Sequence, residues 1–300
     1  MPLKDILAAL VVIVVWGANF VAIKIGVDEL PPMLLGALRF LFVAFPAVFF
    51  VPRPAVSWRY VLGYGATICL GQFMFLFLAI YLGMPAGLSS LVLQSQAFFT
   101  VAIAALVLHE TIRLHHVLGI GLAAVGLVLL DLGAGSDAAV PLVGFLLTLV
   151  AAVSWAAGNV VLKCAGRVNM LSMVVWGALL PPLPFLLLSA AFEGPDLMLH
   201  SLTHISWRGI ASVAYLSGVA TLIGYVLWGR LLASHPVARV APLSLLIPVV
   251  GLLCANLFLG ERLAPVQWLA GLVVLAGLAV NLFGGRWLAR LRAGPGASSS

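Results

Sequence analysis

The side chains of this sequence that could do chemistry are polar groups set within long apolar segments. Arg39 is the one ionisable residue placed well inside such a segment, about seven residues beyond Pro32. A guanidinium forms strong charge-assisted hydrogen bonds with a carboxylate, so Arg39 could bind an amino-acid-like ligand. Its apolar stem could instead carry the charge outward to water, or to Glu29. Residue type and depth leave both interpretations open.

Amide, hydroxyl and aromatic side chains occur at similar depth in other apolar segments. A polar group there costs about 2–7 kcal/mol unless it is hydrogen-bonded, so it should face a ligand, water or a neighbouring helix. Gln94 and Gln96 are about 200° apart on one helix, so we expect only one of them to face a ligand. Deep tryptophans could line a cavity or pack in the core. With Arg39, the candidate substrate-binding residues are Trp16, Asn19, Gln72, Gln94, Gln96, Trp155, Asn159, Trp176, Tyr225 and Ser244.

Four charged residues near the ends of apolar segments are candidates for gating or coupling: Lys24, Glu110, Lys163 and Glu261. The two lysines are most simply charges at helix ends, although their matching positions in two similar stretches leave room for gating. A carboxylate at a helix C-terminus opposes the helix dipole. We therefore expect each glutamate to serve the following turn or the N-terminus of the next helix, with a gate or proton site as the alternative.

The sequence lacks the residue patterns of an enzyme or a metal site. Asp, Glu and His residues all fall at predicted helix ends or in loops, and the six His are scattered. Cys69, Cys164 and Cys254 have no ligand-like spacing, and no GxxxxGK[ST] segment for ATP is present. We therefore expect no enzyme activity, no cofactor and no metal. Downhill transport is favoured, and coupling through Glu110 or Glu261 stays open.

The elements that position these groups are predicted to be membrane-spanning helices. Of 300 residues, 64% are hydrophobic and 8% are charged, which is too few charges to cover a soluble domain. A backbone in hydrocarbon must form helices or a closed barrel, and long unbroken apolar runs favour helices. We predict an all-α polytopic membrane protein with ten spans, at residues 5–26, 31–52, 60–81, 85–108, 114–131, 142–163, 170–191, 208–229, 236–259 and 265–284.

The distribution of basic residues predicts the orientation of these spans. Loops on the side of the N-terminus carry eleven Lys and Arg, and loops on the other side carry three. Short loops rich in Lys and Arg stay in the cytoplasm, so both termini are expected there. The net charge of +6 is explained by this topology, and we expect the lipid bilayer, not nucleic acid, as the macromolecular environment.

An internal repeat organises the chain. Residues 85–110 match residues 236–261 from Pro to Glu, and Trp16 to Lys24 matches Trp155 to Lys163 at identical spacing. Halves of five spans each must face opposite ways, and inverted repeats with a site between them are a common plan of secondary transporters. We predict a first repeat at 1–132, a linker at 133–141, a second repeat at 142–284 and a basic, then disordered, tail at 285–300. A duplicated scaffold with another purpose is the alternative.

Several stretches carry a family resemblance: LVVIVVWGANFVAIKIGV, PPMLLGALRF, GMPAGLSSLVLQSQAFFT, RVAPLSLLIPVVGLL and GERL. Together they resemble the EamA-type branch of the drug/metabolite transporter superfamily over nearly the whole chain. The resemblance implies two inverted five-helix repeats around a central cavity, and export of small amino-acid metabolites such as cysteine or O-acetylserine across a bacterial inner membrane. An uptake permease, an exporter of another metabolite and a receptor subunit without transport are the alternatives.

Overall fold

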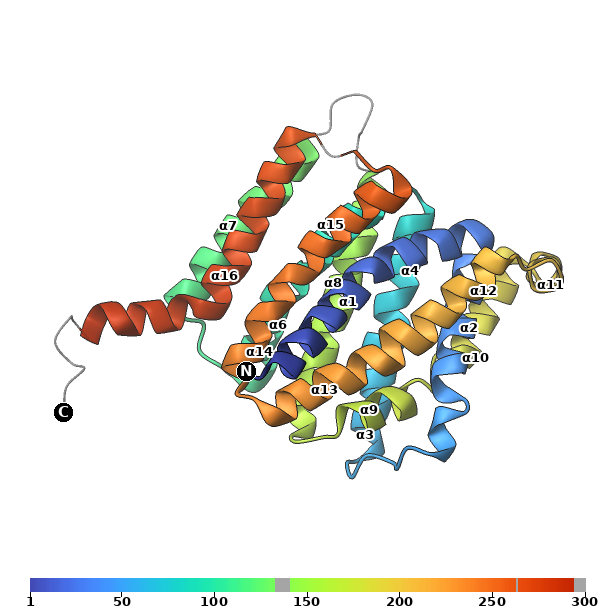
Figure 1. The fold of residues 1–300 in the computed structure, drawn as a ribbon, viewed down its shortest axis with the longest axis horizontal. Helices are drawn as coiled ribbons and strands as arrows, with labels where there is room; N and C mark the ends of the chain where they lie inside the picture. Colours follow the sequence, from blue (N-terminus) through green and yellow to red (C-terminus); the bar gives the residue numbers. More distant parts are fainter. Residues whose placement is uncertain (133–140, 263, 294–300) are drawn as a thin grey trace. The chain divides into compact units, whose positions relative to one another are not determined.

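Helices form all the regular secondary structure in residues 1–132, 141–262 and 264–293, the part of the chain that the computed structural model describes (Figure 1). Within that part, eight helices are long and apolar enough to cross a membrane. Two shorter apolar helices cover Leu114–Leu130 and Leu243–Leu259. These apolar segments follow the order of the predicted spans. The described chain is therefore an all-helical protein with the length and composition of a membrane bundle.

The first half of the chain contains five apolar segments, three of which depart from regular α-helix. Proline begins two of them, at Pro32 and before Ala86, where a missing N–H is tolerated. The elements are α1 (Leu3–Glu29); α2 (Pro32–Ala44) and the 3₁₀ turn η1 (Ala47–Phe49); α3 (Trp58–Tyr64), the π-helical η2 (Gly65–Gly71) and α4 (Gln72–Tyr81); α5 (Ala86–Val92), the 3₁₀ turn η3 (Leu93–Ser95) and α6 (Gln96–Leu108); and α7 (Leu114–Leu132).

The second half follows a similar plan, with one additional short helix, α11 (Pro195–Thr203). Its other elements are α8 (Leu142–Ala165); α9 (Met170–Gly177), α10 (Pro182–Leu188) and the π-helical η4 (Ser189–Glu193); α12 (Trp207–Ala214), the π-helical η5 (Tyr215–Ile223) and α13 (Gly224–Ser234); α14 (Val237–Val240), the 3₁₀ turn η6 (Ala241–Leu245) and α15 (Leu246–Leu259); and α16 (Pro265–Ala293).

The last helix is longer than the predicted span at 265–284, because α16 continues to Ala293 through the basic part of the predicted tail at 285–300. The sequence GRWLARLRA is rich in Leu, Ala and Arg, which have high helix propensity. Basic charge was read as the end of the span, but it does not end the helix. The predicted linker, except for Pro141, and the last seven residues lie outside the described residues.

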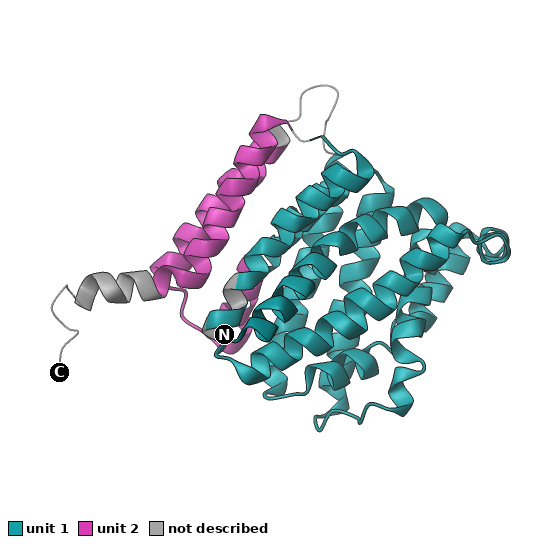
Figure 2. Cartoon of the chain, viewed as in Figure 1, with its two compact units in different colours: residues 1–96, 140–262 teal, residues 97–139, 263–300 magenta. Residues whose placement is uncertain are grey.

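The chain divides into two compact units, drawn in teal and magenta in Figure 2. The smaller unit comprises Ala97–Ala139 and Leu263–Ser300, and within it α7 runs along α16. Glycines allow this close packing, since a Cβ on Gly119 would lie 2.7 Å from the carbonyl oxygen of Gly277. The small residues Gly119, Ala123 and Gly126 on α7 thus allow α7 and α16 to approach closely.

The larger unit, Met1–Gln96 and Val140–Arg262, holds the rest of the bundle. In it α1 lies beside α15 and α13 (Figure 1). A Cβ on Gly17 would lie 2.6 Å from Val250 Cγ1, so α1 and α15 approach as closely as their backbones permit. On the other side of the unit, the rings of Phe40 on α2 and Phe185 on α10 stack at 6.2 Å. These two packed regions hold the helices that surround a cavity.

Candidate functional site

A cavity of about 300 Å³ lies within the larger unit. Side chains from both halves of the chain line it, on α1, α2, α4, α5, α8, α9 and α13 among others. Ten of the eleven candidate substrate-binding residues are part of this lining: Trp16, Asn19, Arg39, Gln72, Gln94, Gln96, Trp155, Asn159, Tyr225 and Ser244. Residues chosen for polarity at depth therefore share one space.

The cavity extends to one end of the helices and stops short of the other. Its lining includes Leu162 near the end of α8, Met170 at the start of α9 and Leu232 near the end of α13. At the opposite end the lining stops at residues such as Arg39 and Ser90, which lie one or more turns inside their helices. The space is thus asymmetric along the helix axes.

Arg39 brings a buried positive charge to this cavity. Its side chain is 4% exposed, and its Nη2 donates to Thr221 Oγ1 at 3.1 Å. The Thr221 hydroxyl in turn donates a hydrogen bond to the carbonyl of Leu216 at 2.7 Å, and both residues lie within the π-helical η5. Within the described residues, Arg39 Nε and Nη1 have no hydrogen-bond partner. The guanidinium is therefore fixed by one hydrogen bond, and two of its nitrogens remain without a partner among the described residues.

The alternative position for Arg39, at the surface or beside Glu29, does not occur. The guanidinium carbon lies 3.9 Å from the ring centroid of Phe73, which holds the charge inside through a cation–π contact. Glu29 instead accepts a hydrogen bond from the Ser206 hydroxyl at 2.6 Å. Arg39 therefore reaches the cavity because an aromatic face is available to it there.

Amide groups add neutral polarity to the lining. Asn19 and Gln72 are 8% and 4% exposed, and their side-chain oxygens have no partner among the described residues. Asn159 Nδ2 donates to Gln96 Oε1 at 2.7 Å, which joins α8 to the start of α6. The lining thus combines two acceptors that have no partner among the described residues with an amide pair joined by a hydrogen bond.

The expectation that Gln94 and Gln96 face different spaces is wrong, because both line the cavity. That expectation assumed the regular angular step of an α-helix through this stretch. The structure has a 3₁₀ turn at Leu93–Ser95, directly before Gln96. A local change of helix type alters the angle between neighbouring residues, and the sequence pattern did not indicate it.

Aromatic rings form one wall of the cavity. Trp16 lies 5.3 Å from Tyr225 and 5.4 Å from Trp228 between ring centroids, and its indole N–H donates to the Ala220 carbonyl at 2.9 Å. Trp16 is therefore fixed in orientation, with its ring beside two others. This arrangement of rings can contact either an apolar side chain or a cation.

Trp176 is the candidate that the structure places elsewhere. Its indole N–H donates to the Val51 carbonyl at 3.0 Å, and its ring packs edge-on against Trp58 at 5.9 Å. Depth along the chain suggested a cavity position, but the side chain points toward the loop after α2. We therefore assign Trp176 to packing at the end of the bundle.

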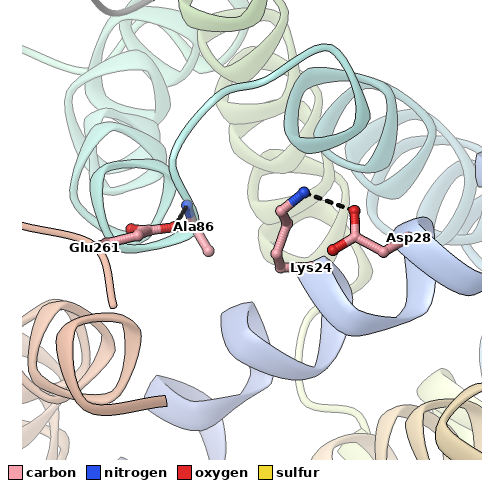
Figure 3. A network of polar contacts seen from close by, with 4 residues as sticks. All are labelled: Lys24, Asp28, Ala86 and Glu261. Atoms are coloured by element: carbon pink, nitrogen blue, oxygen red, sulfur yellow. Dashed lines mark hydrogen bonds and ion pairs between the residues drawn. The ribbon is translucent and has the colours of Figure 1, made fainter. Parts of the chain in front are cut away.

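The charged candidates lie away from the cavity lining. Lys24 pairs with Asp28 at 2.6 Å along α1, and Glu261 accepts the backbone N–H of Ala86 at 2.7 Å (Figure 3). Glu261 also accepts the backbone N–H of Gly87 at 3.0 Å. Glu261 was expected to serve the next turn or helix. It instead satisfies the free amides at the start of α5, far away in sequence.

Lys163 and Glu110 are placed at helix ends, as expected. Lys163 lies in the last turn of α8, and Glu110 follows the end of α6 by two residues. A basic side chain in a last turn interacts favourably with the helix dipole. Their position alone indicates no further role.

Sequence reasoning missed a second carboxylate that holds a helix N-terminus. Glu193 accepts the backbone N–H of Met33 at 2.7 Å and of Leu34 at 3.3 Å, and the Ser189 hydroxyl at 2.6 Å. The Pro31-Pro32 start of α2 gave the only sequence signal, because it marks amides that need acceptors. The cavity lining also includes Tyr64, Phe73 and Trp228, which are not among the candidates. Their depth along the chain did not distinguish these aromatic residues from residues packed in the core.

The side chains that bind metals are dispersed among the described residues. No group of three or more His, Cys, Asp or Glu is arranged among them to hold a metal ion. Arg39 is the one charged side chain in the lining that the structure describes. The site can therefore hold polar and anionic groups, and its described lining contains no Asp, Glu, His or Lys.

Comparison with known proteins places the chain in a family. It matches the EamA-like transporter family over residues 3–131 and 142–283. It is 50% identical to a probable amino-acid metabolite efflux pump of Salmonella typhimurium, covering 95% of this chain and 97% of the relative. It is 47% identical to the protein of the same description in Escherichia coli, covering 98% and 100%.

Solved structures include one with the same fold. That chain is 22% identical, aligns with a TM-score of 0.63, and the alignment covers 94% of this chain and 98% of that one. The family match and the apolar helices together make this a multi-pass membrane protein. The chain belongs to the EamA-like transporter family, and it is a transporter, not an enzyme.

Proposed function

We propose that this protein exports small amino-acid metabolites, of the cysteine and O-acetylserine type, across the bacterial inner membrane. The observation that carries the proposal is the cavity within the larger unit, with polar lining from both halves of the chain. Its volume of about 300 Å³ lies at the small end of ligand pockets, which suits a small metabolite. The descriptions of the two similar relatives support the direction of transport.

The mechanism we propose is alternating access of two inverted repeats, residues 1–132 and 142–284, joined by 133–141. Departures from regular α-helix recur at matching places and support this pairing. The π-helical η2 follows Tyr64, and η5 begins at the matching Tyr215. The 3₁₀ turns η3 and η6 lie in the matching segments 85–110 and 236–261. Broken helices surround the substrate in transporters built from inverted repeats.

We propose the orientation that the basic loops favour, with both termini in the cytoplasm. Cys164 tests this directly, because it is exposed at the end of α8, whereas Cys69 is buried. A membrane-impermeant maleimide should label Cys164 in inverted vesicles and not in right-side-out vesicles. A Cys164→Ser variant measures any background from Cys254. Labelling in right-side-out vesicles would reverse the proposed topology.

With that orientation, the cavity extends toward the cytoplasm, where an exporter loads its substrate. The described lining contains no Asp, Glu or His, the residues that carry protons at membrane depth. We propose that export runs down the metabolite gradient. Accumulation of substrate in proteoliposomes driven by an imposed pH gradient would contradict this and return Glu110 and Glu261 to consideration.

The decisive experiment measures metabolites outside cells that overexpress the chain. Cysteine, O-acetylserine and a broad amino-acid panel are compared with an empty vector and with a Gln72→Ala variant present at equal membrane level. A selective rise with the wild type, reduced by the variant, is expected. Depletion of the medium would favour an uptake permease, a rise in another compound would change the substrate, and no change would favour a receptor subunit.

A further inference from the structure

We infer that the cavity recognises its substrate by a free α-carboxylate, which Arg39 binds, and an ammonium group, which the side-chain oxygens of Asn19 and Gln72 accept. The inference rests on the proposed function, and it specifies which chemical groups a substrate must carry. It begins from buried polar atoms that have no hydrogen-bond partner among the described residues. Such atoms are rare in folded proteins, and each calls for an explanation.

The positive pole of the site is the Arg39 guanidinium. An arginine stays charged in proteins, and a buried charge without a partner is strongly destabilising. Here Thr221 uses one donor and the Phe73 ring covers the flat face, while Nε and Nη1 remain unpaired among the described residues. No carboxylate lines the described cavity. A substrate carboxylate supplies the missing counter-charge in the geometry that a guanidinium prefers.

The opposite pole consists of acceptors. Asn19 and Gln72 line the same cavity, and their buried side-chain oxygens have no donor among the described residues. An ammonium group brings three N–H donors and no acceptor, so it matches two unpaired oxygens. A carboxylate could not satisfy these oxygens. The cavity therefore carries unpaired donors and unpaired acceptors, as a zwitterion requires.

Aromatic rings also line this cavity. The Tyr225 ring lies 5.3 Å from that of Trp16, which in turn lies 5.4 Å from Trp228. Ring faces attract an ammonium group and also contact the apolar part of a side chain. Because an α-amino acid bears both charged groups on one carbon, a small cavity suits it. Amines without a carboxylate would leave Arg39 unpaired.

Four related thiol compounds separate these contributions. Cysteine carries both groups, cysteine methyl ester and cysteamine lack the carboxylate, and 3-mercaptopropionate lacks the ammonium. Binding to the purified full chain is measured under reducing conditions, by competition with labelled cysteine and directly by calorimetry. Cysteine methyl ester and cysteamine should bind at least about 30-fold more weakly than cysteine, because the Arg39 charge is left unpaired. 3-Mercaptopropionate should bind about 10-fold more weakly.

An Arg39→Gln variant then tests which residue binds the carboxylate. Its affinity for cysteine should fall at least about 30-fold, while its affinity for cysteamine should change less than about three-fold, since that compound never used the charge. Arg39→Lys should recover part of the loss for cysteine only. A monodisperse elution profile shows that each variant is folded. The comparison of the four ligands is made on the wild type, so it does not depend on the folding of any variant.

Equal binding of cysteine and its methyl ester by the wild type would overturn the inference and leave the proposed export standing. An equal loss of cysteine and cysteamine in Arg39→Gln would also overturn it, because Arg39 would then act on the fold. Failure of the wild type to bind any of the four compounds would withdraw the inference together with the proposed substrate class. Export in cells, measured separately, distinguishes that last result from a failure of transport.

Discussion

Glu193 and Arg39 each bring a charge into the larger unit, and the protein treats the two in opposite ways. Glu193 lies at the end of the helices where the cavity stops, and it accepts from two backbone amides and one hydroxyl. Arg39 lies in the cavity with two nitrogens that have no partner among the described residues. A satisfied charge holds helices in place, whereas an unsatisfied one provides a place for a ligand.

The comparison extends to the whole end of the bundle beyond the cavity. There Glu29 contacts Ser206, Glu193 contacts the start of α2, and Glu261 contacts the start of α5. Each of these contacts joins an element of the first half to one of the second. If the halves alternate as proposed, this set must separate when the cavity opens to that side. One end thus carries structural contacts, and the centre carries binding groups.

Glu193→Ala should give the largest effect on stability. It removes a charged acceptor from three donors, so the free energy of unfolding should fall by about 3 kcal/mol. Thermal or denaturant unfolding in detergent measures this, and affinity for cysteine should stay within about two-fold. Asp196→Ala, an exposed change on nearby α11, should cost less than about 1 kcal/mol. A large loss of affinity in Glu193→Ala, without loss of stability, would erase the distinction between the two regions.

Gly17→Ala tests the side of α1 that packs against α15. The neighbouring residue, Trp16, lines the cavity. The new methyl would meet Val250 Cγ1 at 2.6 Å and the Gly251 nitrogen at 3.0 Å, and overpacking of this kind costs about 1–3 kcal/mol. The melting temperature should fall accordingly. Gly218→Ala is the matched control, since nothing lies within 4 Å of its Cβ position. Equal behaviour of the two variants would contradict the close approach of α1 and α15.

Thr221→Val tests the comparison at the cavity, where Thr221 contacts Arg39. Valine keeps the shape but removes the acceptor that holds Arg39 Nη2 at 3.1 Å, so affinity for cysteine should fall about five-fold. Thr148→Val is the control, because Thr148 is buried and bonds back to Gly144 at 2.8 Å in the same manner, away from Arg39. The two variants should lose similar stability. An equal loss of affinity in both would show that Thr221 does not act through Arg39.

The sequence predicted the depth of these residues in the membrane better than the direction of their side chains. Depth in the membrane can be counted along the chain, and counting was enough to gather Asn19, Gln72 and Arg39 into one candidate set. The direction in which a side chain points depends on helix rotation and on local changes of helix type. For that reason Gln94 and Gln96 were separated wrongly, and Trp176 was included although it packs against Trp58.

Contacts distant in sequence were the other limit. The order and type of the apolar segments followed from composition and periodicity alone. Glu193 and Met33 are 160 residues apart, and nothing in either local sequence names the partner. The same holds for Glu261 and Ala86, where an expectation based on neighbours in the chain chose the wrong helix. Repeats and resemblance predict architecture, but the choice of partner emerges only when the helices pack.

Lys24→Ala gives the smallest expected effect, and it tests whether Lys24 acts in gating. Its ammonium pairs with Asp28 four residues later at 2.6 Å, with the two side chains 34% and 53% exposed (Figure 3). An exposed pair at that spacing contributes about 0.3–0.5 kcal/mol, so Lys24→Ala should barely lower the melting temperature and leave the transport rate within about two-fold. Asp28→Asn should match it. A ten-fold slower rate in Lys24→Ala alone would mean that the lysine finds a different partner during transport, and the structural end of the molecule would then contain a gate.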